Sequence, residues 1–250
     1  MAVLNAQIWG EPGGKPVVCL HGVTGHGGRF RDLAERLSSC RVVAVDLRGH
    51  GRSSWDAPWG VDAHLDDLRE TAASLEIESA SWVGHSFGGR LVAHLADRDP
   101  DRVERAVLLD PAMHVDPAVA TERASGLRDD VSFGSPDEAI DARLGDGSLF
   151  TTPRAVLEAE AAAHLEHGDD GRYRWRYSPS AVIVAWSEMA TQPPPWPACE
   201  TLVVAGAQSW IPLAVPRLPN LRSVPVPGGH SVLWDDFDET ATAVEQFLAR

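Results

Sequence analysis

The pentapeptide at residues 84–88, Gly-His-Ser-Phe-Gly, constrains the fold of this chain more than any other segment. A short apolar run at residues 80–83 precedes it, and residues 89–96 follow with apolar side chains at helical spacing. A strand, a serine and a helix in direct succession require a tight turn, in which the flanking glycines keep strand and helix from colliding. Such a turn holds the Ser86 hydroxyl at the carboxyl edge of a sheet, near a helix N-terminus that favours negative charge.

The composition predicts one domain in a reducing, cytoplasmic environment. The chain has 250 residues, 44% of them hydrophobic, and no apolar run near the roughly 20 residues of a membrane span. Its first residues lack the basic and apolar regions of a secretory signal. The widely spaced Cys19, Cys40 and Cys199 offer neither a disulfide framework nor a zinc-site spacing. A formal net charge of -14 argues against nucleic acid and anionic membranes as partners.

Short apolar runs alternate with amphipathic helical patterns along most of the chain. Such alternation is typical of a mainly parallel sheet that helices cover on both faces, so we expect an α/β fold. The predicted strands are residues 17–20, 42–45, 80–83, 103–109, 201–205 and 221–226, and the predicted helices are residues 29–37, 61–75, 89–99 and 236–248.

The alternation stops after residue 111. The stretch that follows is rich in Ala, Asp and Glu, and it has helical patterns at residues 152–165 and 178–191 but no clear strand. We therefore predict a helical lid, or cap, inserted over the carboxyl edge of the sheet. The predicted parts are a core domain of residues 1–111 and 198–250 and a lid of residues 112–197.

Four motifs, in their order along the chain, resemble those of the α/β-hydrolase superfamily. They are Leu-His-Gly at residues 20–22, the turn at residues 46–53, the serine pentapeptide, and Pro-Gly-Gly-His at residues 227–230. The resemblance covers nearly the whole chain and is nearest to the lid-bearing esterase, lactonase and C–C bond hydrolase branch. It implies an α/β-hydrolase fold, with a mainly parallel central sheet, helices on both faces and an inserted helical lid.

The resemblance implies a serine nucleophile that a histidine activates. Ser86 lies in the pentapeptide, and His230 follows the last predicted strand, where this fold carries its catalytic base. The backbone N–H groups of Val23 and Phe87 are expected to form the oxyanion hole, because one follows the His-Gly turn and the other follows the nucleophile.

The acidic member of the triad is absent from its usual place. The family carries an Asp in the turn after the penultimate strand, but this turn has Ser209, and residues 206–229 contain no Asp or Glu. Asp110 ends a neighbouring strand at the same edge of the sheet, where certain haloalkane dehalogenases carry their acid. We therefore predict that Asp110 orients His230. The alternatives are Glu188, no acid at all, and a turn-capping role for Asp110.

Three residues are candidates for lining the substrate pocket: His21, Trp186 and Trp210. Residues 172–177 alternate basic and aromatic side chains. The aromatic ones are expected to pack in the core, and the alternative is that they line an apolar acyl pocket. His21 and His26 could suggest a metal pair, but no carboxylate stands beside them. The sequence therefore predicts neither a metal nor another cofactor.

The favoured function is a cofactor-independent serine hydrolase that cleaves carboxylic esters or lactones through an acyl-enzyme. A serine rather than an aspartate in the pentapeptide argues against dehalogenase and epoxide-hydrolase chemistry. C–C bond hydrolysis, thioester cleavage and haloperoxidase-like chemistry stay open on the same residues, as does a non-catalytic ligand-binding protein with this fold. The expected partner is a small, apolar ester or lactone, and the sequence leaves both a monomer and a homodimer open.

Overall fold

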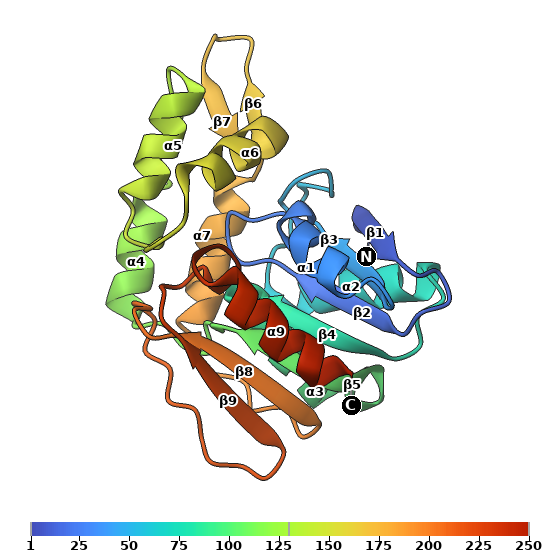
Figure 1. Ribbon diagram of the computed structural model, residues 1–250. Coiled ribbons are helices and arrows are strands. Elements are labelled where there is room, and N and C mark those ends of the chain that lie inside the picture. The colour runs from blue at the N-terminus through green and yellow to red at the C-terminus, as the bar shows by residue number, and fades with distance from the viewer. Residues whose placement is uncertain (1, 130, 250) are drawn as a thin grey trace.

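The computed structural model describes residues 2–129 and 131–249, and its centre is a seven-stranded sheet (Figure 1). The strands are β1 (Ala6–Gly10), β2 (Pro16–Leu20), β3 (Arg41–Val45), β4 (Ala80–His85), β5 (Val103–Leu109), β8 (Glu200–Gly206) and β9 (Leu221–Val226). Their order is β1-β3-β2-β4-β5-β8-β9, and β1 is antiparallel to β3 while the other neighbours are parallel. This arrangement confirms the predicted α/β class.

Helices cover both faces of the sheet, which is why its inner strands contain apolar runs such as residues 17–20 of β2 and residues 106–109 of β5. The helices of the two faces and their short turns are η1 (Gly27–Phe30), α1 (Arg31–Arg36), α2 (Val61–Ser74), α3 (Phe87–Arg98), η2 (Pro100–Arg102), α8 (Val232–Asp235) and α9 (Phe237–Leu248). Leu65 of α2 and Leu91 of α3 belong to the core on one face, and Leu33 of α1 and Phe247 of α9 to the core on the other. In the part of the chain described, no helix is both long enough and apolar enough to cross a membrane.

The edge strands carry weaker sequence signals than the inner ones. β1 was not predicted, because its residues are half-buried or exposed and form no continuous apolar run; Ile8, for example, is exposed. At the other edge, β9 contains Pro225, which an edge strand tolerates because it need not donate every ladder hydrogen bond. The connection from β8 to β9, residues 207–220, contains no helix.

Between β5 and β8 the chain leaves the sheet, and the described residues there form four helices and a small hairpin, which Figure 1 shows together at one end of the molecule. These elements are α4 (Pro117–Ser125), α5 (Pro136–Leu144), α6 (Arg154–His164), β6 (Leu165–His167), β7 (Tyr173–Trp175) and α7 (Pro179–Met189). The last two helices, α6 and α7, confirm the two helical patterns of this segment. The antiparallel pair β6–β7 corrects the expectation of a strand-free segment, because strands of three residues are too short to show a periodicity.

Candidate active site

Ser86 lies at the sharp turn between β4 and α3, with φ 55° and ψ -118°. A non-glycine residue in this conformation is strained and persists only where the surrounding structure holds it. The Ser86 amide donates to the Leu109 carbonyl at 3.0 Å, and the Ser86 carbonyl accepts from the Ala112 amide at 3.0 Å. The end of β5 therefore holds the turn, which presents the serine at the N-terminus of α3.

Gly84 and Gly88 allow β4 and α3 to meet at this turn. A Cβ on Gly84 would press on the carbonyl of Gly88, and a Cβ on Gly88 would press on the carbonyl of Leu20. Both carbonyls belong to backbone inside the sheet-helix junction, so neither can swing aside. The two glycines around Ser86 are thus a steric requirement of the turn.

Ser86, His230 and Asp110 are buried and form one hydrogen-bonded chain. Ser86 Oγ lies 2.9 Å from His230 Nε2, and His230 Nδ1 lies 2.6 Å from Asp110 Oδ2. A carboxylate oxygen only accepts, so Nδ1 carries the ring proton and Nε2 is left to accept from the serine hydroxyl. This tautomer is the one in which His230 can take the proton of Ser86.

Asp110 comes from the end of β5 and has a positive φ of 40°. Its amide donates to the Val204 carbonyl at 2.7 Å, which ties it to β8. Its carboxylate accepts from His230, from the Gly206 amide at 3.0 Å and from Ser209 Oγ at 2.5 Å. Ser209 therefore stands where the family usually carries the acid and donates to an acid from the neighbouring strand. This contact was not predicted from the sequence, where the only signal for it is a serine at the position that usually carries the acid.

Other carboxylates near the site serve other groups. Glu188 Oε1 accepts from the Val61 amide at 3.3 Å, at the start of α2. Asp235 and Asp236 accept from the amides of the two glycines before His230, at 2.9 Å and 2.6 Å. These two aspartates hold the backbone that carries His230, and Asp110 alone bonds its ring among the carboxylates of the residues described.

His85 is a second histidine at this site, and the sequence did not predict a role for it. Its ring centre lies 4.8 Å from that of His230, and its Nε2 lies 2.9 Å from the His230 carbonyl oxygen. Desolvation lowers the pKa of His85 to about 3, so the ring is neutral near neutral pH and Nε2–H donates to that carbonyl. His85 thus braces the backbone of His230 without adding a positive charge beside it.

Ion pairs tie the loop after β2 to α6. Glu160 of α6 is buried and pairs with Arg29 at 2.6 Å and with His26 Nε2 at 2.8 Å. His26 Nδ1 accepts from the Gly28 amide, so Nε2 carries the proton that His26 donates to Glu160. Burial by itself would raise the pKa of the Glu160 carboxyl, but Arg29 and His26 outweigh it and hold that pKa well below its usual range.

Thr24, in the same loop, has a positive φ of 62° and two arginine donors. Arg143 of α5 donates to its hydroxyl at 3.0 Å, and Arg29 donates to its carbonyl at 3.1 Å. Thr24 directly follows Val23, whose amide is expected to bind an oxyanion. The segment between β5 and β8 therefore contacts the loop next to Ser86.

A cavity of about 450 Å³ opens onto Ser86 and His230. Trp186 and Trp210 line it, and the Trp210 ring centre lies 5.7 Å from that of His230. Residues of α4, α5 and β7 also contribute to its wall. Within residues 2–129 and 131–249, no three His, Cys, Asp or Glu side chains converge as a metal site.

Three further residues were candidates for the core or for the pocket wall. Trp175 and Tyr177 pack partly on the core, as predicted, and also line the cavity, which was the alternative for them. His21 does not line this cavity, contrary to the prediction. Its Nδ1 donates to the Gly22 carbonyl at 2.7 Å, and its Nε2 accepts from the Leu47 amide at 2.9 Å. Burial lowers the pKa of His21 well below its usual value, so this neutral ring supports the backbone of two loops.

Similarity to known proteins agrees with this geometry. Residues 15–137 match the family described as alpha/beta hydrolase fold. The chain is 38% identical to lipase LipV of Mycobacterium tuberculosis over 187 residues. The aligned region covers 75% of this chain and 71% of that protein. The chain belongs to the α/β-hydrolase family. This α/β hydrolase is also 29% identical to the 3-hydroxybutyrate-oligomer hydrolase of Cupriavidus necator, over 96% of this chain and 90% of that protein.

A solved structure repeats the fold of this α/β hydrolase. The enol-lactonase from Burkholderia xenovorans LB400 superimposes with a TM-score of 0.82 at 22% identity, over 99% of this chain and 96% of that one. This likeness concerns the fold alone. The family and the relatives named lipase and hydrolase identify the chain as an enzyme, a hydrolase, rather than the non-catalytic binding protein left open by the sequence.

Proposed function

We propose that this α/β hydrolase cleaves carboxylic esters or lactones through an acyl-enzyme on Ser86. The observation that carries the proposal is the unbroken chain of hydrogen bonds from Ser86 through His230 to Asp110 beside the cavity. A serine hydroxyl is a weak nucleophile, and an imidazole that a carboxylate orients is what activates it. A relative named lipase supports an ester as the substrate.

In the first half-reaction, Ser86 Oγ bonds to the substrate carbonyl carbon while its proton passes to His230 Nε2. Asp110, 2.6 Å from Nδ1, stabilises the imidazolium that forms. The tetrahedral adduct then breaks its bond to the leaving oxygen, and His230 gives the proton to the departing alcohol. In the second half-reaction a water molecule loses a proton to His230 and attacks the acyl carbon. The acid leaves, and the proton returns to Ser86.

The amides of Val23 and Phe87 are proposed to hold the oxyanion. Phe87 is the first residue of α3, so its N–H has no acceptor within that helix. Gly22 supports the role of the adjacent Val23, because a Cβ on Gly22 would lie 2.8 Å from Ser86 Cβ and would push the loop away. Two such donors, fixed before the reaction, lower the barrier by stabilising charge that develops in the transition state.

Residues 112–197 are proposed to act as the lid of this site, with residues 1–111 and 198–250 as the core domain. Helices α4, α5 and α7 supply much of the cavity wall. The apolar side chains of this wall include Leu127, Phe133 and Trp186, which come from these helices and the adjoining loops. An apolar wall supports a substrate with an apolar body.

A short series of p-nitrophenyl esters and a fluorophosphonate probe test the proposal. The wild type should release p-nitrophenol and bind the probe at Ser86. Ser86→Ala should lose labelling and lower kcat by roughly 10⁶-fold. Ser187→Ala, an exposed serine of α7, is the matched control and should keep both. No turnover of any ester or lactone by the wild type, or labelling that survives Ser86→Ala, would contradict the proposal.

A further inference from the structure

We propose that the cavity selects esters or lactones that carry a carboxylate, and that Arg123 binds this carboxylate. The inference rests on the proposed hydrolysis at Ser86 and adds a charged end to the apolar substrate body.

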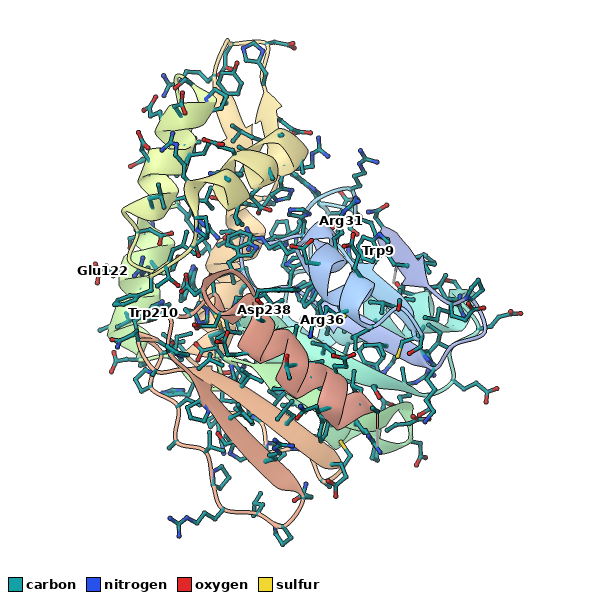
Figure 2. All side chains as sticks on the ribbon, in the orientation of Figure 1. Trp9, Arg31, Arg36, Glu122, Trp210 and Asp238 are labelled. Atoms are coloured by element: carbon teal, nitrogen blue, oxygen red, sulfur yellow. The ribbon has the colours of Figure 1, made fainter. Side chains whose placement is uncertain are left out.

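Arg123 lies in the last turn of α4 and lines the same cavity as Ser86. Its guanidinium carbon is 5.2 Å from the centre of the Trp210 ring, and Figure 2 shows Trp210 beside α4. Among the residues described, the Arg123 side chain has no hydrogen bond or ion pair. An arginine over an aromatic ring keeps its N–H donors available, and their planar fork matches a carboxylate.

The two other arginines of the wall are already engaged. Arg29 pairs with Glu160 at 2.6 Å, and Arg143 lies 3.9 Å from Asp146. Both contribute positive potential to the cavity, but their donors serve the protein. Arg123 is the arginine of this wall whose donors face no acceptor within residues 2–129 and 131–249.

Two carboxylates also line the cavity, those of Glu122 and Asp146. Glu122 is exposed to solvent, where Figure 2 shows it at the outer edge of α4, and Asp146 lies 3.9 Å from Arg143, so neither pairs with Arg123. The chain as a whole has a net charge of -14, which repels anions at long range. At physiological salt this repulsion is screened beyond about 8 Å, so the contact with the guanidinium decides the binding of a substrate inside the cavity.

One indole ring separates Arg123 from the proposed base. The Trp210 ring centre lies 5.7 Å from that of His230 and 5.2 Å from the Arg123 guanidinium carbon. A carboxylate on Arg123 and a carbonyl at Ser86 would therefore be joined by a short chain that runs along Trp210. Such a molecule is a half-ester of a short dicarboxylic acid, or a lactone that bears a carboxylate on a short side chain.

Mono-p-nitrophenyl glutarate and p-nitrophenyl pentanoate give a matched pair of substrates. Their acyl chains have equal length and the same leaving group, and only the glutarate ends in a carboxylate. The wild type should favour the glutarate in kcat/KM by about 10- to 100-fold, because a hydrogen bond to a charged group is stronger than a neutral one. Arg123→Gln should lose this preference, because it should raise KM for the glutarate far more than KM for the pentanoate. Arg123→Lys should keep part of it.

Arg128→Gln is the matched control, because Arg128 is exposed and does not line the cavity. It should retain the full preference. A second readout avoids turnover altogether: free glutarate should slow fluorophosphonate labelling of Ser86 in the wild type but not in Arg123→Gln. Rising salt should weaken both effects in the wild type.

Two sets of results separate the failure of this inference from that of the proposed function. Equal rates on the two esters, equal losses on both in Arg123→Gln, or labelling that glutarate does not slow would overturn the carboxylate site and leave ester hydrolysis intact. Turnover of neither ester, together with no labelling of Ser86, would overturn the proposed function and the carboxylate site with it.

Discussion

At the scale of the residue, Ser209 and Asp110 together form the acidic end of the site. Ser209 Oγ lies 2.5 Å from Asp110 Oδ2, and the same carboxylate oxygen lies 2.6 Å from His230 Nδ1. A carboxylate on either residue could therefore reach the imidazole. The ends of β5 and β8 both lie within reach of His230 Nδ1, so the acid can come from either strand.

Moving the carboxylate from residue 110 to residue 209 should preserve part of the activity. Asp110→Asn should lower kcat by roughly 10³- to 10⁴-fold, because an amide no longer fixes the His230 tautomer. Adding Ser209→Asp to that variant should recover about tenfold, since the new carboxylate can accept from Nδ1. Ser209→Ala alone should cost less than about tenfold, because it removes one hydrogen bond to the acid.

Steady-state kinetics on one p-nitrophenyl ester measure all three variants, and circular dichroism checks that each is folded. A double variant no faster than Asp110→Asn would contradict the shared role of the two positions.

At the scale of the element, α6 is joined to the loop after β2 by a buried carboxylate. Glu160 accepts hydrogen bonds from Arg29 and His26, which lie 131 and 134 residues earlier in the chain. Removing the carboxylate leaves the buried Arg29 charge without a partner. The resulting loss of folding free energy is larger than the net stabilisation that the intact pair contributes.

Glu160→Gln should lower the free energy of unfolding by about 3 kcal/mol, because the Arg29 charge loses its partner in a buried site. It should also lower kcat more than it raises KM, since the loop that carries Val23 is released. Urea unfolding and ester kinetics measure the two effects. Glu158→Gln is the control on the same helix: its side chain is exposed and pairs with Arg154, so its loss should cost under about 1 kcal/mol. Equal losses in the two variants would contradict the role of Glu160.

At the scale of the whole molecule, buried histidines make the fold sensitive to acid. Burial lowers the pKa of His64 to about 3 and that of His50 to about 4, from the usual 6.5. Between those values the unfolded chain binds protons that the folded chain does not. The stability that neutral histidines contribute is therefore complete above pH 6.5 and is lost as the pH falls toward the folded-state values.

The free energy of unfolding should fall by about 1.4 kcal/mol per pH unit for each such histidine below its usual pKa. Urea unfolding at about pH 7.5 and about pH 5.5 measures this slope. His64→Gln should make it shallower, while His114→Gln, at an exposed position, should leave it unchanged. A slope that His64→Gln does not alter would show that other groups control acid unfolding.

The sequence by itself determined the parallel sheet and the order of its motifs. Inner strands such as β2 and β5 are apolar on both faces, so they stand out as continuous runs. Ser86 and its glycines are recognisable because the constraint on them is local, a turn that brings a strand and a helix together. Asp110 was predictable as the partner of His230 because the usual turn contains no carboxylate.

Only the tertiary structure decided what surrounds this site. The bond from Ser209 to Asp110, the neutral His85 beside His230 and the pairing of Glu160 with Arg29 join residues that are far apart in the chain. Periodicity reports which face of an element is buried, but not which residue of another element meets it. That choice depends on how the segment between β5 and β8 and the loops pack over the sheet, and packing at this edge is also what brings Arg123 into the cavity.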